Sequence, residues 1–216
     1  MNIQDRHGAL KVLSAYASRE TEAGRLRERD ILREVTGASP LHHGFKRVVH
    51  LLHEFTFESF VGQYICFAVD VLSYSVPSSQ SQLSDPRLPL KWIIHLKKQV
   101  LVCLEYLYDE CKVSHSGMLC TPFTVATGRS HHPTGSKPGN ILLLPSDIDK
   151  IVVRELSDQP ATIYDFPRTV PPNELPFHPV LSIPRIFSLG TDQHAGFYWV
   201  IADLGHGALT RCAKSE

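Results

Sequence analysis

The stretches VSHS (residues 113–116) and KPGNILL (residues 137–143) decide how this sequence is interpreted. The first closes an amphipathic segment, and in the second a Lys-Pro-Gly-Asn tetrapeptide precedes three apolar residues. Between them stand 20 residues, GMLCTPFTVATGRSHHPTGS, which have neither helical nor strand periodicity and include no Asp or Glu. Lys-Pro-Gly-Asn alone is typical of an ordinary turn. With His115 on one side and an apolar run on the other, we interpret it as part of a site.

The composition is that of a soluble globular protein long enough to bury a sizeable core, with 216 residues, 43% of them hydrophobic. Its 22 basic and 22 acidic residues produce no field that would attract nucleic acid or an anionic membrane. Five scattered cysteines with no CxxC spacing favour free thiols in a reducing compartment. Neither a signal-peptide core nor an apolar run of membrane-spanning length is present. We therefore expect an intracellular protein.

Hydrophobic periodicity predicts an α+β protein. Apolar or alternating runs predict strands at 9–13, 47–55, 63–72 and 197–204. Apolar residues at three- and four-residue steps predict helices at 20–35 and 88–111. Residues 76–87 are a predicted loop, 140–144 are again apolar, and 152–188, with seven prolines, are a predicted connector.

Three charged residues stand within these elements. Lys11 lies in the apolar strand ALKV (residues 9–12), where it could hold a phosphate or could extend into solvent from an edge strand. Glu28, in RLRERDIL (residues 25–32), is our choice for its ion-pair partner; Asp30 and Glu34 are alternatives, and a solvated charged face is another explanation. Asp203, in IADLG (residues 201–205), ends a strand and could hold a metal ion or form a common turn.

Taken in their order along the chain, ALKV, VSHS, KPGNILL and IADLG resemble the catalytic core of eukaryotic-type serine/threonine protein kinases. ALKV resembles the strand whose Lys holds the α/β-phosphates, and IADLG resembles the metal-binding DFG signature. VSHS and KPGNILL, joined across two missing positions, resemble the catalytic loop H-x-D-x-K-P-x-N-I-L-L. The resemblance implies ATP and Mg²⁺ as cofactors, and Asn140 and Asp203 as metal ligands. The catalytic residues that it implies are Lys11, Glu28, His115, Lys137, Asn140 and Asp203.

The runs VVHLLHEF (residues 48–55) and YICFAVDVL (residues 64–72), IADLG, and the long connector before it resemble SR-protein-specific kinases in particular. The resemblance covers about residues 7–116 and 137–207. It implies an incomplete bilobal kinase fold: a partial small lobe and hinge at 1–75, a partial large lobe at 76–207 with an insert at 117–136 and a spacer at 145–196, and a tail at 208–216. The ATP-binding residues that it implies are Lys11 at the phosphates and, framing the adenine, Ala9, Val69, Asp70, Leu72 and Leu142.

The function implied by this resemblance is ATP-dependent phosphorylation of Ser in Arg/Ser-rich proteins. It would take place in the cytoplasm and nucleus as part of mRNA splicing regulation, with no direct binding of nucleic acid or membrane.

The sequence departs from the kinase pattern at three places. Only ten residues precede Lys11, so we expect no glycine-rich loop over the phosphates. The catalytic Asp is missing, because residues 117–136 include no acidic residue. The chain ends 11 residues after Gly205, so we expect the groove that docks Arg/Ser-rich substrates to be absent and the apolar face of 88–111 to be partly bare.

These departures lead us to expect a chain truncated at both ends with little or no turnover. One alternative is a pseudokinase-like fragment that binds nucleotide or protein without transferring phosphate. Another is a gene-model artefact in which 117–136 is a retained intron, which sequencing of the transcript would test.

Two other site types fit the sequence poorly. The pairs His42-His43 and His131-His132, with Cys120, have no HxxxH or CxxC spacing that would suit zinc. Ser116 beside His115 lacks the G-x-S-x-G elbow of a hydrolase.

Overall fold

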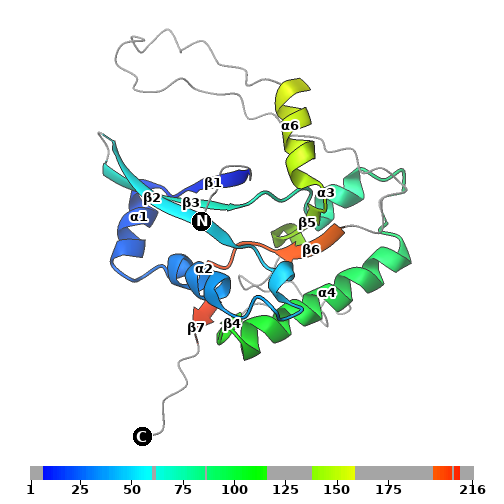
Figure 1. Ribbon diagram of the computed structural model, residues 1–216, viewed down its shortest axis with the longest axis horizontal. Helices are drawn as coiled ribbons and strands as arrows, with labels where there is room; N and C mark the ends of the chain where they lie inside the picture. The colour runs from blue at the N-terminus through cyan, green and yellow to red at the C-terminus, as the bar shows by residue number, and fades with distance from the viewer. Residues whose placement is uncertain are drawn as a thin grey trace, which may run out of the picture. The chain divides into compact units, whose positions relative to one another are not determined.

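A computed structural model of the protein describes residues 7–59, 62–85, 87–115, 138–158, 197–205 and 207–209. The chain divides into two compact units, 1–146 with 195–216, and 147–194. Small antiparallel sheets and several helices confirm the predicted α+β class (Figure 1). The lobe boundaries expected from the sequence stay a prediction.

The first unit contains a three-stranded antiparallel sheet with the order β1-β3-β2. Its strands are β1 (Gly8–Val12), β2 (Leu51–Ser59) and β3 (Gly62–Asp70). The predicted strand at 9–13 is confirmed, but the prediction that it is buried is wrong. Leu10 and Val12 are more than half exposed, because they alternate with Lys11 and lie on the opposite, more open face of this edge strand.

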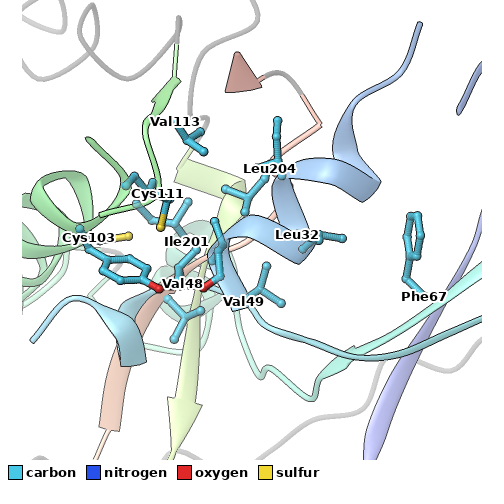
Figure 2. Close-up of a cluster of buried hydrophobic side chains, with 14 of the residues drawn as sticks. Leu32, Val48, Val49, Phe67, Cys103, Cys111, Val113, Ile201 and Leu204 are labelled. Carbon is cyan, nitrogen blue, oxygen red and sulfur yellow. Dashed lines mark hydrogen bonds between the residues drawn. The ribbon is translucent and has the colours of Figure 1, made fainter. Parts of the chain in front are cut away.

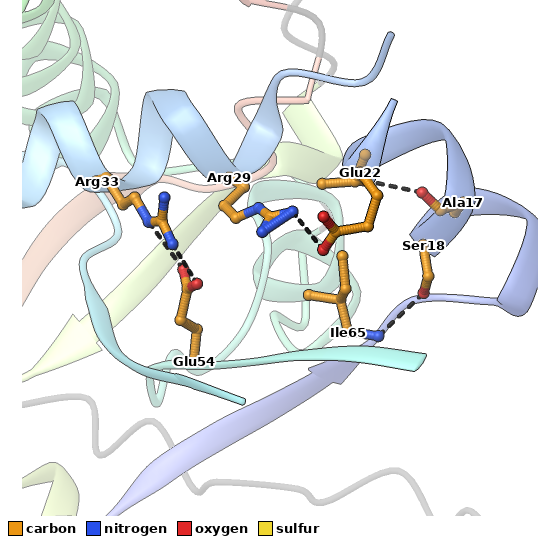
Figure 3. A network of polar contacts seen from close by, with 8 residues as sticks. Ala17, Ser18, Glu22, Arg29, Arg33, Glu54 and Ile65 are labelled. Atoms are coloured by element: carbon orange, nitrogen blue, oxygen red, sulfur yellow. Dashed lines mark hydrogen bonds and ion pairs between the residues drawn. The ribbon is translucent and has the colours of Figure 1, made fainter. Parts of the chain in front are cut away.

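The single helix predicted at 20–35 is two helices, α1 (Ala15–Glu22) and α2 (Glu28–Gly37). Gly24 separates them with a φ of +70°, a left-handed backbone that glycine adopts at little cost. Ion pairs then tie α2 to its neighbours (Figure 3). Arg29 pairs with Glu22 of α1 at 2.7 Å, and Arg33 Nε donates to Glu54 of β2 at 3.0 Å. The charged side chains Arg29 and Arg33 of α2 are therefore paired with neighbouring elements of the same molecule.

Helix α3 (Val76–Ser81) lies where a loop was predicted. Its first turn is stabilised by Ser75, whose hydroxyl accepts a hydrogen bond from the Ser78 amide, and by Pro77, which suits a helix start. Helix α4 (Leu90–Asp109) confirms the helix predicted at 88–111. In the second unit, helix α6 (Ile148–Asp158) makes the predicted connector wrong for residues 152–158; residues 159–196 lie outside the described part of the chain.

The core of the first unit forms where α2, α4, the segment before β2 and the strand β6 (Phe197–Ile201) meet (Figure 2). Leu32 from α2, Cys103 from α4, Val48 and Ile201 are all almost fully buried there. Tyr106 of α4 donates its buried hydroxyl proton to the Val35 carbonyl of α2 at 2.7 Å. The two helices are thus joined through the core.

Two short strand pairs complete the described elements. Strand β5 (Ile141–Pro145) follows the 3-10 turn η2 (Pro138–Asn140) and pairs antiparallel with β6, so that Ile141 lies opposite Ile201. Strand β4 (Val113–His115) pairs with β7 (Gly207–Leu209), and a second 3-10 turn, η1 (Phe45–Arg47), precedes β2. The predicted strand at 197–204 is confirmed over its first five residues.

Among the helices that the structure describes, none combines the length and the apolar character needed to cross a bilayer.

Candidate functional site

The first half of the candidate site joins β1 to the start of α2. Lys11 Nζ lies 2.5 Å from Glu28 Oε1, and the side chains are 42% and 14% exposed. Glu28 is the first residue of α2, where the helix dipole favours a carboxylate. The partner of Lys11 on this helix is therefore Glu28; Asp30 and Glu34 instead line a shallow hollow with Arg33. A pair this exposed adds little stability, so we infer that it mainly orients the lysine.

The second half is built by the pairing of β5 with β6. The Ala202 amide donates to the Asn140 carbonyl at 2.8 Å, which extends the strand ladder by one bond. Asn140 Nδ2 then donates to Asp203 Oδ2 at 3.3 Å. Asp203 has a φ of +58°, an uncommon left-handed conformation that Asp tolerates better than most residues. This change in backbone direction directly follows β6 and places the Asp203 carboxylate next to Asn140.

The two halves meet at Lys11, whose Nζ also lies 3.7 Å from Asp203 Oδ1. Lys11, Glu28, Asn140 and Asp203 thus form one group of side chains, which we call the Lys–Asp cluster. Asp203 is 44% exposed, so the cluster is open to solvent on one side.

Gly205 borders this cluster and is a residue that sequence reasoning missed. A Cβ at this position would lie 3.4 Å from Asp203 Oδ1 and 3.6 Å from Glu28 Oε2. A larger side chain would therefore crowd the space between the two carboxylates. The Gly that ends the IADLG motif was the available signal.

Of the other predicted catalytic residues, His115 is described by its backbone only. It ends β4 and lies opposite Gly207, so the backbone of residues 113–115 pairs with β7, the strand that follows Asp203. Lys137 and the insert at 117–136 lie outside the described residues.

The residues predicted to frame adenine are brought together in part. Ala9 lies opposite Val69 in the β1–β3 ladder. Directly after Leu72, the Ser73 amide donates to the Leu143 carbonyl at 2.7 Å, which connects the end of this sheet to β5 next to Leu142.

Asp70 differs from the other predicted adenine-binding residues because its carboxylate faces the protein. It is 4% exposed, and its Oδ2 accepts a hydrogen bond from the His50 amide at 2.9 Å and lies 3.0 Å from His50 Nδ1. The side chain is thus occupied in joining β3 to the start of β2. A buried carboxylate needs such partners, but nothing in the sequence distinguishes His50 among twelve histidines.

The chemistry of the Lys–Asp cluster suits a metal-bound polyphosphate. Asn140 and Asp203 offer hard oxygen donors of the kind that Mg²⁺ prefers, and Lys11 offers a cation to phosphate oxygens. No group of three or more His, Cys, Asp or Glu side chains that could hold a metal ion occurs in the described parts of the chain. A Mg²⁺ ion at Asn140 and Asp203 would therefore take further ligands from water or phosphate, as Mg²⁺ commonly does.

Comparison with known proteins agrees with this chemistry, although no family model matches the chain. Serine/threonine-protein kinase spk-1 of Caenorhabditis briggsae is 31% identical over 113 residues, and protein kinase dsk1 of Schizosaccharomyces pombe is 29% identical over 114 residues. The chain is a distant relative of these protein kinases. Spk-1 of Caenorhabditis elegans matches similarly, at 31% over 111 residues.

The kinase relationship covers about half of this chain, 51–52% in the three comparisons. The matched segment spans only 10%, 20% and 11% of the three kinases, respectively. What the whole kinases do is therefore carried to this chain only as a proposal.

Proposed function

We propose that this chain is an ATP-dependent serine/threonine kinase of the SR-protein kinase type that binds Mg·ATP at the Lys–Asp cluster and whose phosphoryl transfer is impaired. The observation that carries the proposal is the 3.7 Å separation between Lys11 Nζ and Asp203 Oδ1. The two residues come from opposite ends of the chain, and the kinase pattern requires both of them at one nucleotide.

Each member of the cluster has a role in this proposal. Lys11 binds and neutralises phosphate oxygens, and Glu28 holds the lysine in place. Asn140 and Asp203 would hold magnesium, which when bound would supply positive charge that neutralises the phosphates. The apolar side chains of Ala9, Val69, Leu72 and Leu142 contact the adenine. Asp70 takes part only through its backbone, because its carboxylate is engaged by His50.

Transfer is impaired because the chain lacks a carboxylate where the substrate hydroxyl would release its proton. Residues 117–136 include no Asp or Glu. General base catalysis is worth about 10²–10⁴-fold. The resemblance implies that Lys137 stabilises the transferred phosphoryl group, but neither Lys137 nor His115 replaces a carboxylate general base.

The same absence favours a second candidate, a non-catalytic protein that binds nucleotide or a protein partner. In either case Arg/Ser-rich proteins are the proposed partners, and the cytoplasm and nucleus the proposed location, by relationship to the SR-protein kinases.

The test is binding of a fluorescent ATP analogue with Mg²⁺ and with EDTA. We expect Lys11→Met to weaken Mg²⁺-dependent binding by about tenfold or more, because it removes a charge-assisted contact to phosphate. Asp203→Asn should abolish the difference between Mg²⁺ and EDTA. Lys46→Met, which removes an exposed lysine of η1, is the matched control and should leave binding unchanged.

A parallel assay measures phosphate transfer to an Arg/Ser peptide. Slow transfer that Lys11→Met abolishes supports the impaired kinase, and binding without transfer supports the second candidate. Absence of binding, or binding that neither substitution alters, would rule out the impaired kinase and the nucleotide-binding form of the second candidate.

A further inference from the structure

His50 and Asp70 hold each other at the point where β3 ends and β2 is about to begin. Asp70 is the last residue of β3, and His50 directly precedes β2. The Asp70 amide donates to the His50 carbonyl at 3.3 Å, and the His50 amide donates to Asp70 Oδ2 at 2.9 Å. The same oxygen lies 3.0 Å from His50 Nδ1 and accepts from it, because an ionised carboxylate has no proton to donate. Both the backbones and the side chains thus join the two residues.

The imidazole ring of His50 is fixed from its other side by the core. The Phe45 ring of η1 packs against it, with the ring centroids 4.1 Å apart. Phe45 in turn meets Tyr106 of α4 edge-on, with centroids 6.0 Å apart. The His50 side chain is 12% exposed, and within the described parts of the chain its Nε2 has no hydrogen-bond partner. The polar contact of the ring is therefore the one from Nδ1 to Asp70.

This contact anchors the backbone that leads out of β3. Residues 71–72 belong to no helix or strand, and Ser73 follows them. The Ser73 amide donates to the Leu143 carbonyl of β5 at 2.7 Å, which holds the far end of this short segment. His50 holds the near end, at Asp70. Residues 71–72 therefore lie between two anchors, one of which depends in part on a side chain.

We propose that His50 is a positioning residue for a bound adenine. It acts through Asp70, by keeping the backbone of residues 70–72 in the place where the base lies. The inference rests on the proposed function, in which this segment borders the adenine and the Lys–Asp cluster binds the phosphates. A binding segment that is already ordered loses less conformational entropy when its ligand binds. Without the His50 ring, contacts to the base should weaken, while the phosphate contacts, which other residues make, should remain.

A purely structural role for His50 would have a different effect. Because the ring packs on Phe45, its loss could loosen the core, and the binding of every ligand would then fall together. Two probes separate these roles: Mg·tripolyphosphate engages only the Lys–Asp cluster, whereas Mg·ATP also carries the base. The quantity to follow is the ratio of their dissociation constants, measured by calorimetry on the whole chain. Loss of folded protein weakens both and leaves the ratio unchanged.

The main test variant, His50→Leu, removes Nδ1 but keeps an apolar side chain against Phe45. We expect it to weaken binding of Mg·ATP by about tenfold and of Mg·tripolyphosphate by less than about twofold, because the hydrogen bond that it removes holds only the base-binding segment. His50→Asn, whose amide nitrogen can take the place of Nδ1, should restore most of the affinity for Mg·ATP. His53→Leu is the matched control, since His53 is exposed on β2 and should change neither affinity.

If His50→Leu does not fold, two polar variants replace it. His50→Gln carries its amide one bond farther from the backbone than Nδ1, so it should weaken Mg·ATP relative to Mg·tripolyphosphate, whereas His50→Asn should not. An unchanged ratio in His50→Leu, or equal ratios in the two polar variants where His50→Leu does not fold, would overturn the positioning role and leave the proposed function standing. A wild-type chain that binds neither probe would overturn the proposed function and this inference together.

Discussion

Helices α2 and α4 each bury one face in the same core, but their outer faces differ in kind. On α2 the outer face carries Arg29 and Arg33, which pair with Glu22 and Glu54 of neighbouring elements. On α4 it carries an apolar row centred on Leu101. The outer face of α2 therefore contributes to holding the helix that presents Glu28, whereas the apolar row of α4 is exposed.

The largest difference between the two helices should appear when one apolar side chain is shortened on each. Ile31 of α2 is fully buried, so Ile31→Ala should lower the free energy of unfolding by about 2–5 kcal/mol. Leu101→Ala should change it by less than about 0.5 kcal/mol, because the side chain is exposed. Urea denaturation measures both. Equal losses would mean that the outer face of α4 is covered within the chain.

The hydrogen bond that joins the two helices should have the next largest effect. Tyr106→Phe removes the buried bond from the hydroxyl to the Val35 carbonyl, and we expect a loss of about 1–2 kcal/mol in unfolding free energy. Tyr108→Phe is the control two residues away, on the exposed face, and should have no measurable effect. If the two variants are equally stable, the bond does not connect α4 to α2 in solution.

The end of α4 should also make stability depend on alkaline pH. Burial raises the pKa of the Cys111 thiol from 9.0 to about 11. Above about pH 9 the unfolded chain therefore loses a proton that the folded chain keeps, and stability falls until about pH 11. At about pH 10 the loss from this thiol is about 1.4 kcal/mol. Denaturation at about pH 8 and about pH 10 should show a smaller fall for Cys111→Ala than for the wild type; an identical fall would contradict the assignment.

The smallest effect is expected on the outer face of α2. Arg33→Gln removes the ion pair with Glu54, which is worth about 0.2–1 kcal/mol at this exposure. The loss should shrink in high salt, because salt screens exposed charges. Arg87→Gln, at an exposed position before α4, should change stability at neither salt concentration. A loss of equal size in high salt would show that packing of the arginine stem, rather than charge, holds α2.

The parts of the fold that could be predicted are those with a strong local pattern. The apolar period of 88–111 predicts α4, and the order of ALKV, KPGN and IADLG predicts that Lys11, Asn140 and Asp203 converge. The structure does have these three side chains in one cluster, while their catalytic roles stay predictions.

The parts that could not be predicted depend on single residues or on distant contacts. The break between α1 and α2 follows from the backbone of Gly24, within a segment whose periodicity is otherwise helical. Helix α3 depends on the cap from Ser75 in a stretch whose composition favours a loop. The burial of the Asp70 carboxylate depends on His50, which is distant in sequence and has no motif around it.

The Lys–Asp cluster is assembled from strands and a helix at almost opposite ends of the described chain, and its Asn140–Asp203 bond alone spans 63 residues. Contacts of such long range form only after most of the chain has been ordered, and they slow folding. A ligand that recognises all four side chains would therefore bind the fully folded molecule but not a partly folded intermediate. Its binding could serve as a readout of complete folding, and it would raise the melting temperature of the first unit as a whole rather than of one element.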